Sequence, residues 1–496
     1  MPLNLSNRDQ NSGHLFYNRR LRAAITRFSV RMKHDDRKQQ AALALSLVFV
    51  LLGAGWMELL HMMKPAGLVG QSAIVGNRDT GAIYVRVDGR LYPALNLTSA
   101  RLIAGSATTP TWVKAAEIAK FPTGPMIGIP GVPDELAIVS APTSAWSVCD
   151  TAPAGATGGP TVVTAIAGVL PGGGRSAALG EQQAIVASHR GNNYLVWNGQ
   201  RASIDLASRA VTFNLGLDPA ATTPVPLSDA LFDALPVGDP LVIPTVPAMG
   251  SPSRWLPGSL VGRVLVTSDA GGRTSGFYVL LADGVQPITG FVADLLRTAN
   301  SQGFLAPQLV SPDTLVTIPQ VMSIRVSGYP SSKLNFVDTV ANPVTCFSWA
   351  KQSTDRQAAT TILSGRGLPV PIDLDSHIVN LVGNKTDSVL AAAQQSLILP
   401  GANNFAVSTS AAPNSDTRES LYWVSPQGVR YGIEWDQPTL LALGLDPDRA
   451  AQAPWPVLRL FAAGPAISRD LAAVARDTVD PSGSATVLRP RNSGPQ

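Results

Sequence analysis

Residues 41–57 read AALALSLVFVLLGAGWM, a stretch that contains no charged side chain. The apolar character continues to residue 63 and is interrupted only by Glu58 and His61. A helix over residues 41–63 would be roughly 35 Å long, which exceeds the hydrocarbon thickness of a bilayer, about 30 Å. The stretch therefore predicts a single transmembrane helix.

Polar and aromatic residues mark both ends of this predicted span. Arg37 and Lys38 precede it, Trp56 lies where an interfacial aromatic ring belongs, and Lys64 follows it. The excess of cations before the span predicts a cytoplasmic N-terminus and places the rest of the chain beyond the membrane. A buried helix of a soluble protein and a cleaved signal peptide are the alternatives. A signal peptide is disfavoured because 40 residues precede the run and no small-residue cleavage site follows it.

The charge of the chain is unevenly distributed. The net charge is +4, yet residues 1–40 hold nine basic and three acidic side chains. The remaining residues hold 29 basic and 31 acidic side chains, so the basic character belongs to the N-terminal arm. The folded part therefore gives no reason to expect a nucleic-acid partner.

The N-terminal arm has a helical pattern of its own. Its apolar residues fall on one stripe, which consists of Tyr17, Leu21, Ile25, Phe28 and Met32, and arginines surround that stripe. This pattern predicts a basic amphipathic helix that docks on a partner or on anionic lipid. A merely solvated helix beside the membrane is the alternative.

The only two cysteines, Cys149 and Cys346, follow the predicted span. An oxidising compartment favours a disulfide between them, and two buried thiols are the alternative. Only His189 and His377 lie in this region as further soft ligands, and neither has metal-ligand spacing to a cysteine, so we expect no metal site.

Four segments of the chain follow one plan. Each has a strand with an aromatic residue, a turn that ends in glycine, a second short strand and a helical stretch. The turn glycines are Gly89, Gly199, Gly284 and Gly428, and the helical stretches are expected near 96–104, 206–215, 290–299 and 437–443. Two of the segments share the residues LGLDP, at 215–219 and 443–447, where glycine ends the helix and proline prevents its continuation.

These repeats predict a membrane-anchored α+β protein with a β-rich central domain. The N-terminal part comprises an arm (1–40), the transmembrane helix (41–63) and a linker (64–80). Four α/β repeats, each of about 50 residues, are expected at 81–133, 193–253, 276–321 and 419–476. The intervening segments 134–192, 254–275 and 322–418 are expected to assemble the central domain, and residues 477–496 to form a flexible tail.

Several short motifs together resemble one known family. They are YVRV at 84–87, RLYPALNLTSARL at 90–102, GIPGVP at 128–133, Trp146 with Cys149, GVRYG at 428–432 and APW at 453–455. With them the chain resembles EccB, a core component of mycobacterial type VII (ESX) secretion systems. The resemblance implies a complex in the inner membrane with EccC, EccD and EccE, in which the EccB-like chain supplies one anchor helix and most of the periplasmic mass. It also implies four repeats around a central domain and a disulfide between Cys149 and Cys346.

The family is often labelled an ATPase, and the residues do not support that label. A phosphate-binding loop needs a Gly-Lys pair after a glycine-rich turn, and the chain has no Gly-Lys dipeptide. The nearest segments, 172–176 and 383–386, are interpreted as loops. The zinc-protease and serine-hydrolase motifs are also missing, and the acidic residues beside His377 are typical of a solvated loop.

The sequence thus predicts a structural subunit that forms a periplasmic scaffold and associates with further copies of itself. No catalytic residue, cofactor or metal ligand is expected. The alternatives are a periplasmic hydrolase or ATPase and a module that binds the cell wall.

Overall fold

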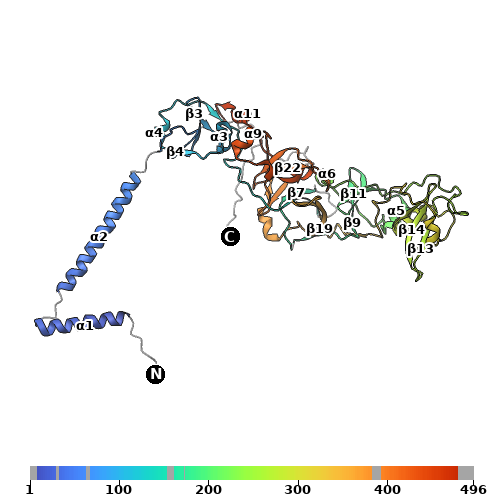
Figure 1. The fold of residues 1–496 in the computed structure, drawn as a ribbon, viewed down its shortest axis with the longest axis horizontal. Helices are drawn as coiled ribbons and strands as arrows, with labels where there is room; N and C mark the ends of the chain where they lie inside the picture. The colour runs from blue at the N-terminus through green and yellow to red at the C-terminus, as the bar shows by residue number, and fades with distance from the viewer. Residues whose placement is uncertain are drawn as a thin grey trace, which may run out of the picture. The chain divides into compact units, whose positions relative to one another are not determined.

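The computed structural model describes residues 8–28, 33–62, 67–153, 161–172, 174–382 and 392–478 (Figure 1). The chain divides into two compact units, one up to Leu68 and one from Val69 onward. The first unit is helical and the second contains all the strands of the described residues, so each is described by itself.

The N-terminal unit consists of two helices, α1 (Arg8–Arg27) and α2 (Lys33–Met62). The segment Gln40–Met57 of α2 is long and apolar enough to cross a membrane, and none of it is buried by protein. Helix α1 ends before the last two residues of the predicted stripe, because Phe28 adopts a positive φ of 49° that a right-handed helix does not allow.

The described residues of the second unit form five sheets. Four of them, called here the first to fourth outer sheets, share one arrangement, in which three antiparallel strands are followed by a helix and a fourth strand parallel to the first. The central sheet has seven strands and lies between the second and fourth outer sheets in the hydrophobic core.

The elements of the first and second outer sheets are short. The first contains β1 (Ile74–Asn77), β2 (Ile83–Val87), β3 (Arg90–Ala94), α3 (Leu97–Ala104), β4 (Thr111–Val113), α4 (Ala115–Ile118), β5 (Met126–Ile127) and β27 (Ala475–Arg476). The second contains β9 (Gln183–His189), β10 (Asn192–Trp197), β11 (Gln200–Ile204), α5 (Arg209–Leu215), β12 (Val225–Pro226), α6 (Asp229–Ala234) and β17 (Asn335–Phe336).

The third and fourth outer sheets repeat the plan. The third contains β13 (Val264–Ser268), β14 (Thr274–Leu280), β15 (Val285–Ile288), α7 (Gly290–Ala299), β16 (Gln308–Leu309) and α8 (Pro312–Val316). The fourth contains β22 (Phe405–Thr409), β23 (Leu421–Val424), β24 (Val429–Ile433), α9 (Gln437–Leu443), η2 (Pro447–Arg449), β25 (Ala451–Pro454), α10 (Trp455–Leu458), β26 (Ala462–Ala463) and α11 (Arg469–Ala472).

The predicted turns and helix ends occur where the sequence places them. Asp88 and Gly89 have φ values of 49° and 78°, which is the geometry of a tight hairpin turn. The helices α3, α5, α7 and α9 coincide with the four predicted helical stretches. Gly216 and Gly444 of the two LGLDP segments end α5 and α9 in the left-handed conformation, as expected.

Each outer sheet begins one strand earlier than the sequence predicts. Strand β13 was expected in the central domain, within 254–275, but it pairs with β14 in the third outer sheet. Strands β9 and β22, expected in the central segments 134–192 and 322–418, likewise open the second and fourth outer sheets. Between β9 and β10, for example, Arg190 and Gly191 both have positive φ and form a second tight turn, which no Asp-Gly or Asn-Gly pair marks in the sequence.

The central sheet has the strand order β20-β21-β7-β6-β18-β19-β8. Its elements are β6 (Thr143–Thr151), β7 (Val162–Ala167), β8 (Ser176–Ala178), β18 (Val344–Gln352), β19 (Ala359–Gly365), η1 (Ile372–His377), β20 (Val379–Asn380) and β21 (Gln395–Ile398). Its middle strands are buried on both faces, because helices α6 and α10 cover one face and the segment around η1 covers the other.

The outer sheets are joined through their helices. Helix α3 contacts α9, which joins the first outer sheet to the fourth, and α5 contacts α7, which joins the second to the third. Helix α6 of the second outer sheet contacts α10 of the fourth over the central sheet. The body from Val69 onward is therefore one connected structure with the central sheet in its middle.

Candidate functional site: the disulfide-bridged centre and a polar cleft

Strands β6 and β18 form the middle of the molecule and carry the two cysteines. Cys149 lies directly opposite Cys346 in the antiparallel register, and a disulfide joins them, with their Cα atoms 4.0 Å apart. Both residues are fully buried, and the bond between them confirms the predicted disulfide and shows that the alternative of two buried thiols is wrong. The bond closes a loop with a sequence separation of 197. In the chain-entropy model a loop of this size stabilises the fold by up to about 5 kcal/mol.

The same register brings the flanking residues into pairs. Trp146 lies opposite Trp349, and both rings are buried on the face that α6 and α10 cover. The Nε1 atom of Trp146 donates to Ser144 Oγ at 2.9 Å, and its ring meets Phe461 edge-on at 5.9 Å. These aromatic rings are part of the core and are not arranged as a ligand cage.

Asp150, next to the bridged cysteine, ties the central sheet to the second outer sheet. Its carboxylate accepts hydrogen bonds from Ser228 N and Ser228 Oγ, both at 2.7 Å, and Ser228 is the N-cap residue of α6. Burial raises the pKa of Asp150 to about 7, and the two hydrogen bonds from Ser228 oppose this rise. Asp150 is thus a buried acid that titrates near neutral pH.

His189 does not form a hydrolytic triad with these groups. Its Nε2 atom lies 3.2 Å from Asp229 Oδ1, and its ring stacks on Phe232 at 3.8 Å. The nearby Ser228 hydroxyl, however, donates to Asp150 and accepts from Leu231 N, so it is not oriented by the histidine. The cluster fixes α6 against β9 and offers no activated nucleophile.

The remaining candidates from the sequence are the segments 172–176 and 383–386 and the loop around His377. Where the structure describes them, their side chains contact neighbouring residues of the fold. Arg175, in the segment 172–176, forms an ion pair with Asp375 of η1 through its Nη2 atom. His377 lies in the same turn, and its Nδ1 atom is 3.4 Å from the Ser376 hydroxyl. The segment 383–386 lies outside the described residues. Among the described residues, no group of three or more His, Cys, Asp or Glu side chains is placed to hold a metal ion.

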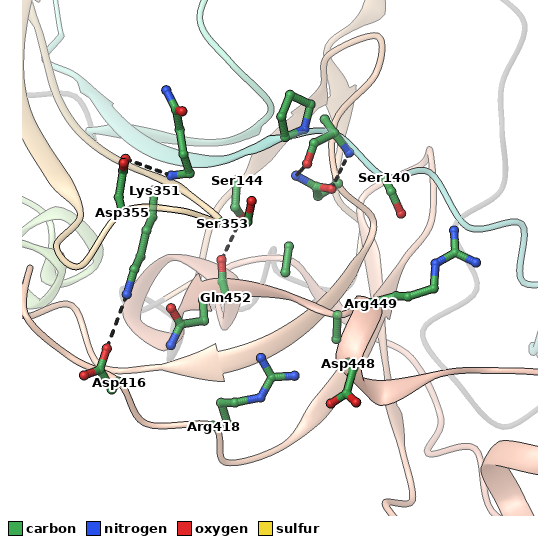
Figure 2. Close-up of a pocket in the computed structure, with 16 residues that line it drawn as sticks. Ser140, Ser144, Lys351, Ser353, Asp355, Asp416, Arg418, Asp448, Arg449 and Gln452 are labelled. Atoms are coloured by element: carbon green, nitrogen blue, oxygen red, sulfur yellow. Dashed lines mark hydrogen bonds and ion pairs between the residues drawn. The ribbon is translucent and has the colours of Figure 1, made fainter.

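A polar cleft of about 450 Å³ opens beside the end of β6 and β18 (Figure 2). Four segments and Asn403 line it, namely 140–144, 351–355, 416–418 and 448–452, which come from the central and fourth outer sheets. Lys351 reaches towards Asp416, with 3.5 Å between Nζ and Oδ1. The sequence analysis missed this cleft because its residues are far apart in the chain and form no motif.

The N-terminal site residues lie on exposed helices where they are described. Tyr17, Leu21 and Ile25 are on α1 and are 61%, 42% and 70% exposed. Trp56 is on α2 and is 64% exposed, whereas Phe28 lies one residue beyond the end of α1. Arg37 and Lys38 are within α2, but the structure does not describe their side chains. Met32 and Lys64 lie outside the described residues.

Comparison with known proteins identifies relatives over nearly the whole chain. The family model for the type VII secretion system ESX-1 transport TM domain B matches residues 3–481. The ESX-2 secretion system ATPase EccB2 of Mycobacterium tuberculosis H37Rv is 59% identical over 488 residues, which cover 98% of each chain. The ESX-3 secretion system ATPase EccB3 of Mycolicibacterium smegmatis is 40% identical and covers 95% of this chain and 91% of its own length.

Solved structures agree with this grouping. A chain of an intact ESX-5 inner membrane complex matches with a TM-score of 0.76 and 36% identity, and 99% of both chains is covered. A chain of the EccB3 dimer from the ESX-3 core complex matches with a TM-score of 0.71 and 39% identity, over 82% of this chain and 100% of that one. The chain therefore belongs to the EccB family of type VII secretion systems.

Proposed function

We propose that this chain is a structural, membrane-anchored core component of a type VII secretion complex. The proposal rests on a contrast between the two units. In α2, none of the described residues buries the apolar segment Gln40–Met57, whereas in the body the side chains that could have been catalytic form contacts that hold the fold together. The solved relatives support it, because they come from an ESX-5 inner membrane complex, its periplasmic assembly and an EccB3 dimer.

The proposed topology has one membrane crossing. Helix α2 spans the inner membrane through Gln40–Met57, with Trp56 at one interface and with Arg37 and Lys38 on the cytoplasmic side. The body from Val69 onward is periplasmic in this proposal. The disulfide supports this side of the membrane, since disulfides persist in oxidising compartments.

Helix α1 is proposed to be a docking element on the cytoplasmic side. Tyr17, Leu21 and Ile25 expose apolar area, and arginines such as Arg20 and Arg22 lie on the same helix. An exposed apolar stripe of this kind fits a groove on a partner protein. By family resemblance the proposed partners are EccC, EccD and EccE, together with further copies of this chain through the periplasmic body.

The four outer sheets are proposed to be four copies of one α/β repeat around the central domain. Their common strand order, the helices in the same place and the two LGLDP helix ends support this division. Each copy starts with the strand before the predicted hairpin, so the units begin near residues 74, 183, 264 and 405. The central domain then comprises the strands of the central sheet.

Relatives of this chain carry the word ATPase in their names, and a name does not show catalytic activity. We infer that the chain is not an enzyme. Asp150, Ser228 and His189 are the grouped titratable and nucleophilic side chains of the buried centre, and each is engaged in holding α6.

Purification from native membranes tests the proposal. Full-length protein with an affinity tag, extracted in mild detergent, is expected to migrate as a large assembly that contains several copies of the chain and other ESX membrane components by mass spectrometry. A variant Ile25→Glu is expected to lose cytoplasmic partners, because it places a charge on the apolar stripe of α1. The neighbouring variant Thr26→Glu adds the same charge beside the stripe and is the matched control. Migration of the unaltered chain as a lone monomer would overturn the proposal.

A further inference from the structure

The polar cleft of Figure 2 has three cationic side chains and three carboxylates, so its charges balance. A smaller hollow in the third outer sheet is different. It lies where β13 begins and α7 ends, and it is lined by the segments 262–264, 300–302 and 306–307 together with Arg297 and Phe304. None of these lining residues, all of which the structure describes, is acidic, whereas two of them are arginines.

The first of these arginines, Arg263, is held in place without being neutralised. Its Cζ atom lies 3.1 Å from the centre of the Phe304 ring, which is a cation–π contact. Its Nε atom is buried and has no hydrogen-bond partner, and no ion pair among the described residues includes Arg263. Burial and, after it, the charge of Arg297 lower the pKa of Arg263, so the two guanidinium groups are close enough to repel each other.

The second arginine, Arg297, is positioned by the loop that follows α7. Its Nη2 atom donates to Leu305 O at 2.7 Å, which uses one of its five N–H donors. Arg297 lies in the last turn of α7, where the partial negative charge of the helix end stabilises a cation but is smaller than two full charges. Asp294, one turn earlier on α7, forms no ion pair with Arg297 among the described residues. The hollow therefore holds two fixed cations that lack a full counter-charge.

The charge and the size of the hollow indicate the kind of ligand. One doubly charged anion neutralises two guanidinium groups, and a phosphate group carries a charge of about −1.5 to −2 at neutral pH. The forked donors of arginine also match the oxygen atoms of a phosphate group. The hollow has a volume of about 10 Å³, which is room for one oxygen-sized atom. One oxygen of the anion can therefore enter the hollow while the rest of the group remains at its mouth.

We propose that Arg263 and Arg297 bind one phosphate group, whose oxygen atoms accept hydrogen bonds from both guanidinium groups. Free inorganic phosphate and a phosphate group at the end of a larger molecule offer the same oxygen atoms, because the part of the ligand outside the hollow is in solvent. The site does not depend on the proposed membrane assembly, since both arginines belong to the third outer sheet of the body.

Calorimetric titration of the full-length protein in detergent micelles with inorganic phosphate tests the proposal. Sodium chloride keeps the ionic strength constant during the titration, because a change in screening alone would alter weak interactions between charges. The expected result is saturable binding with one site per chain. The absence of saturable binding would overturn the proposal.

Substitutions assign the binding to the two arginines. Arg263→Gln and Arg297→Gln are each expected to weaken phosphate binding at least about tenfold, because each removes a charge-assisted hydrogen bond. Arg297→Lys keeps the charge but loses the fork, so it should weaken binding less than Arg297→Gln does. Arg273→Gln removes an exposed arginine between β13 and β14 of the same sheet and is the matched control, with unchanged affinity. Equal weakening in Arg273→Gln, or unchanged binding in the folded Arg263→Gln or Arg297→Gln protein, would contradict the proposal.

Two further anions test the charge of the ligand and its source. Acetate carries a single charge and is expected to bind at least about tenfold more weakly than phosphate, because it neutralises only one guanidinium group. Acetate binding as tight as that of phosphate would overturn the assignment. Glycerol 3-phosphate with an affinity close to that of phosphate would support a phosphate group on a larger molecule. Glycerol 3-phosphate that binds much more weakly than phosphate would support free inorganic phosphate as the ligand.

Discussion

Helix α2 and strand β6 carry similar apolar side chains in opposite surroundings. Leu43 and Val50 of α2 are 70% and 67% exposed, whereas Trp146 and Val148 of β6 are completely buried. In the body, helices and loops cover both faces of the sheet, whereas none of the described residues buries the apolar segment Gln40–Met57 of α2. In the proposed topology this difference corresponds to two solvents, lipid for α2 and the protein interior for β6.

Charges introduced into α2 should have the largest effect of all the changes predicted, because they act on membrane insertion itself. The double variant Leu47→Arg and Leu51→Arg is expected to disfavour membrane insertion by about 5–7 kcal/mol, because each arginine near the centre of a span costs about 3 kcal/mol. Alkaline extraction of membranes should then release the protein. The double variant Leu305→Arg and Leu441→Arg, at exposed sites of the body, should remain in the membrane fraction. Equal retention of both variants would show that α2 is not the anchor.

Removal of the disulfide should give the next largest effect, confined to the body. Cys149→Ser is expected to lower the free energy of unfolding by about 2–5 kcal/mol, because it releases a long loop in the unfolded chain. Chemical denaturation of the purified protein measures this change. The control Ser147→Ala removes one hydrogen bond to Ser348, two positions along the same strand pair, and should cost about 1 kcal/mol. A stability equal to that of the unaltered protein would contradict the role of the bridge.

The buried carboxyl group of Asp150 should make the body sensitive to pH. Its pKa is raised from 3.8 in the unfolded chain to about 7, so the folded state holds the proton more tightly. This contribution to stability is fully present below about pH 4 and is lost as the pH rises through 7, with an expected size of about 4 kcal/mol. Denaturation at several pH values should show a difference between the unaltered protein and Asp150→Asn that decreases over this range. A difference that is constant with pH would refute the assignment.

The ion pair between Arg459 and Asp233 should contribute least. Its partners lie 2.6 Å apart and join α10 to α6, but their side chains are 25% and 49% exposed. A partly solvated pair of this kind contributes at most about 1 kcal/mol. Arg459→Gln should therefore change the midpoint of denaturation only slightly. A loss of stability as large as that caused by Cys149→Ser would show that the contact between α10 and α6 dominates the stability of the body.

Local patterns explain which features could be predicted from the sequence. The uncharged run at 41–57, the Asp-Gly and Asn-Gly turns and the two LGLDP helix ends are each set by neighbouring residues, and the structure contains the corresponding elements. The disulfide was also predictable, because the chain has only two cysteines. The exact opposition of Cys149 and Cys346 in the central sheet was not, since strand register depends on contacts between distant segments.

The boundaries of the outer sheets and the polar cleft escaped prediction for the same reason. Strand β13 is short, and only its pairing with β14 decides to which sheet it belongs. The cleft combines Lys351 with Asp416 and Arg418 from a different sheet, so no spacing in the sequence reveals it. Helix α1 ended earlier than the apolar stripe suggested, because the backbone at Phe28 turns into a left-handed conformation.

Cysteine accessibility on the two sides of α2 tests the central claim most directly. Cys149 and Cys346 are bridged and buried, so a cysteine introduced at Asn11 or at Thr109 would be the only reactive thiol in each variant. In intact spheroplasts a membrane-impermeant maleimide should label Thr109→Cys and should label Asn11→Cys only after lysis. Labelling of both positions before lysis, or of Asn11→Cys alone, would contradict the account that α2 separates a cytoplasmic arm from a periplasmic body.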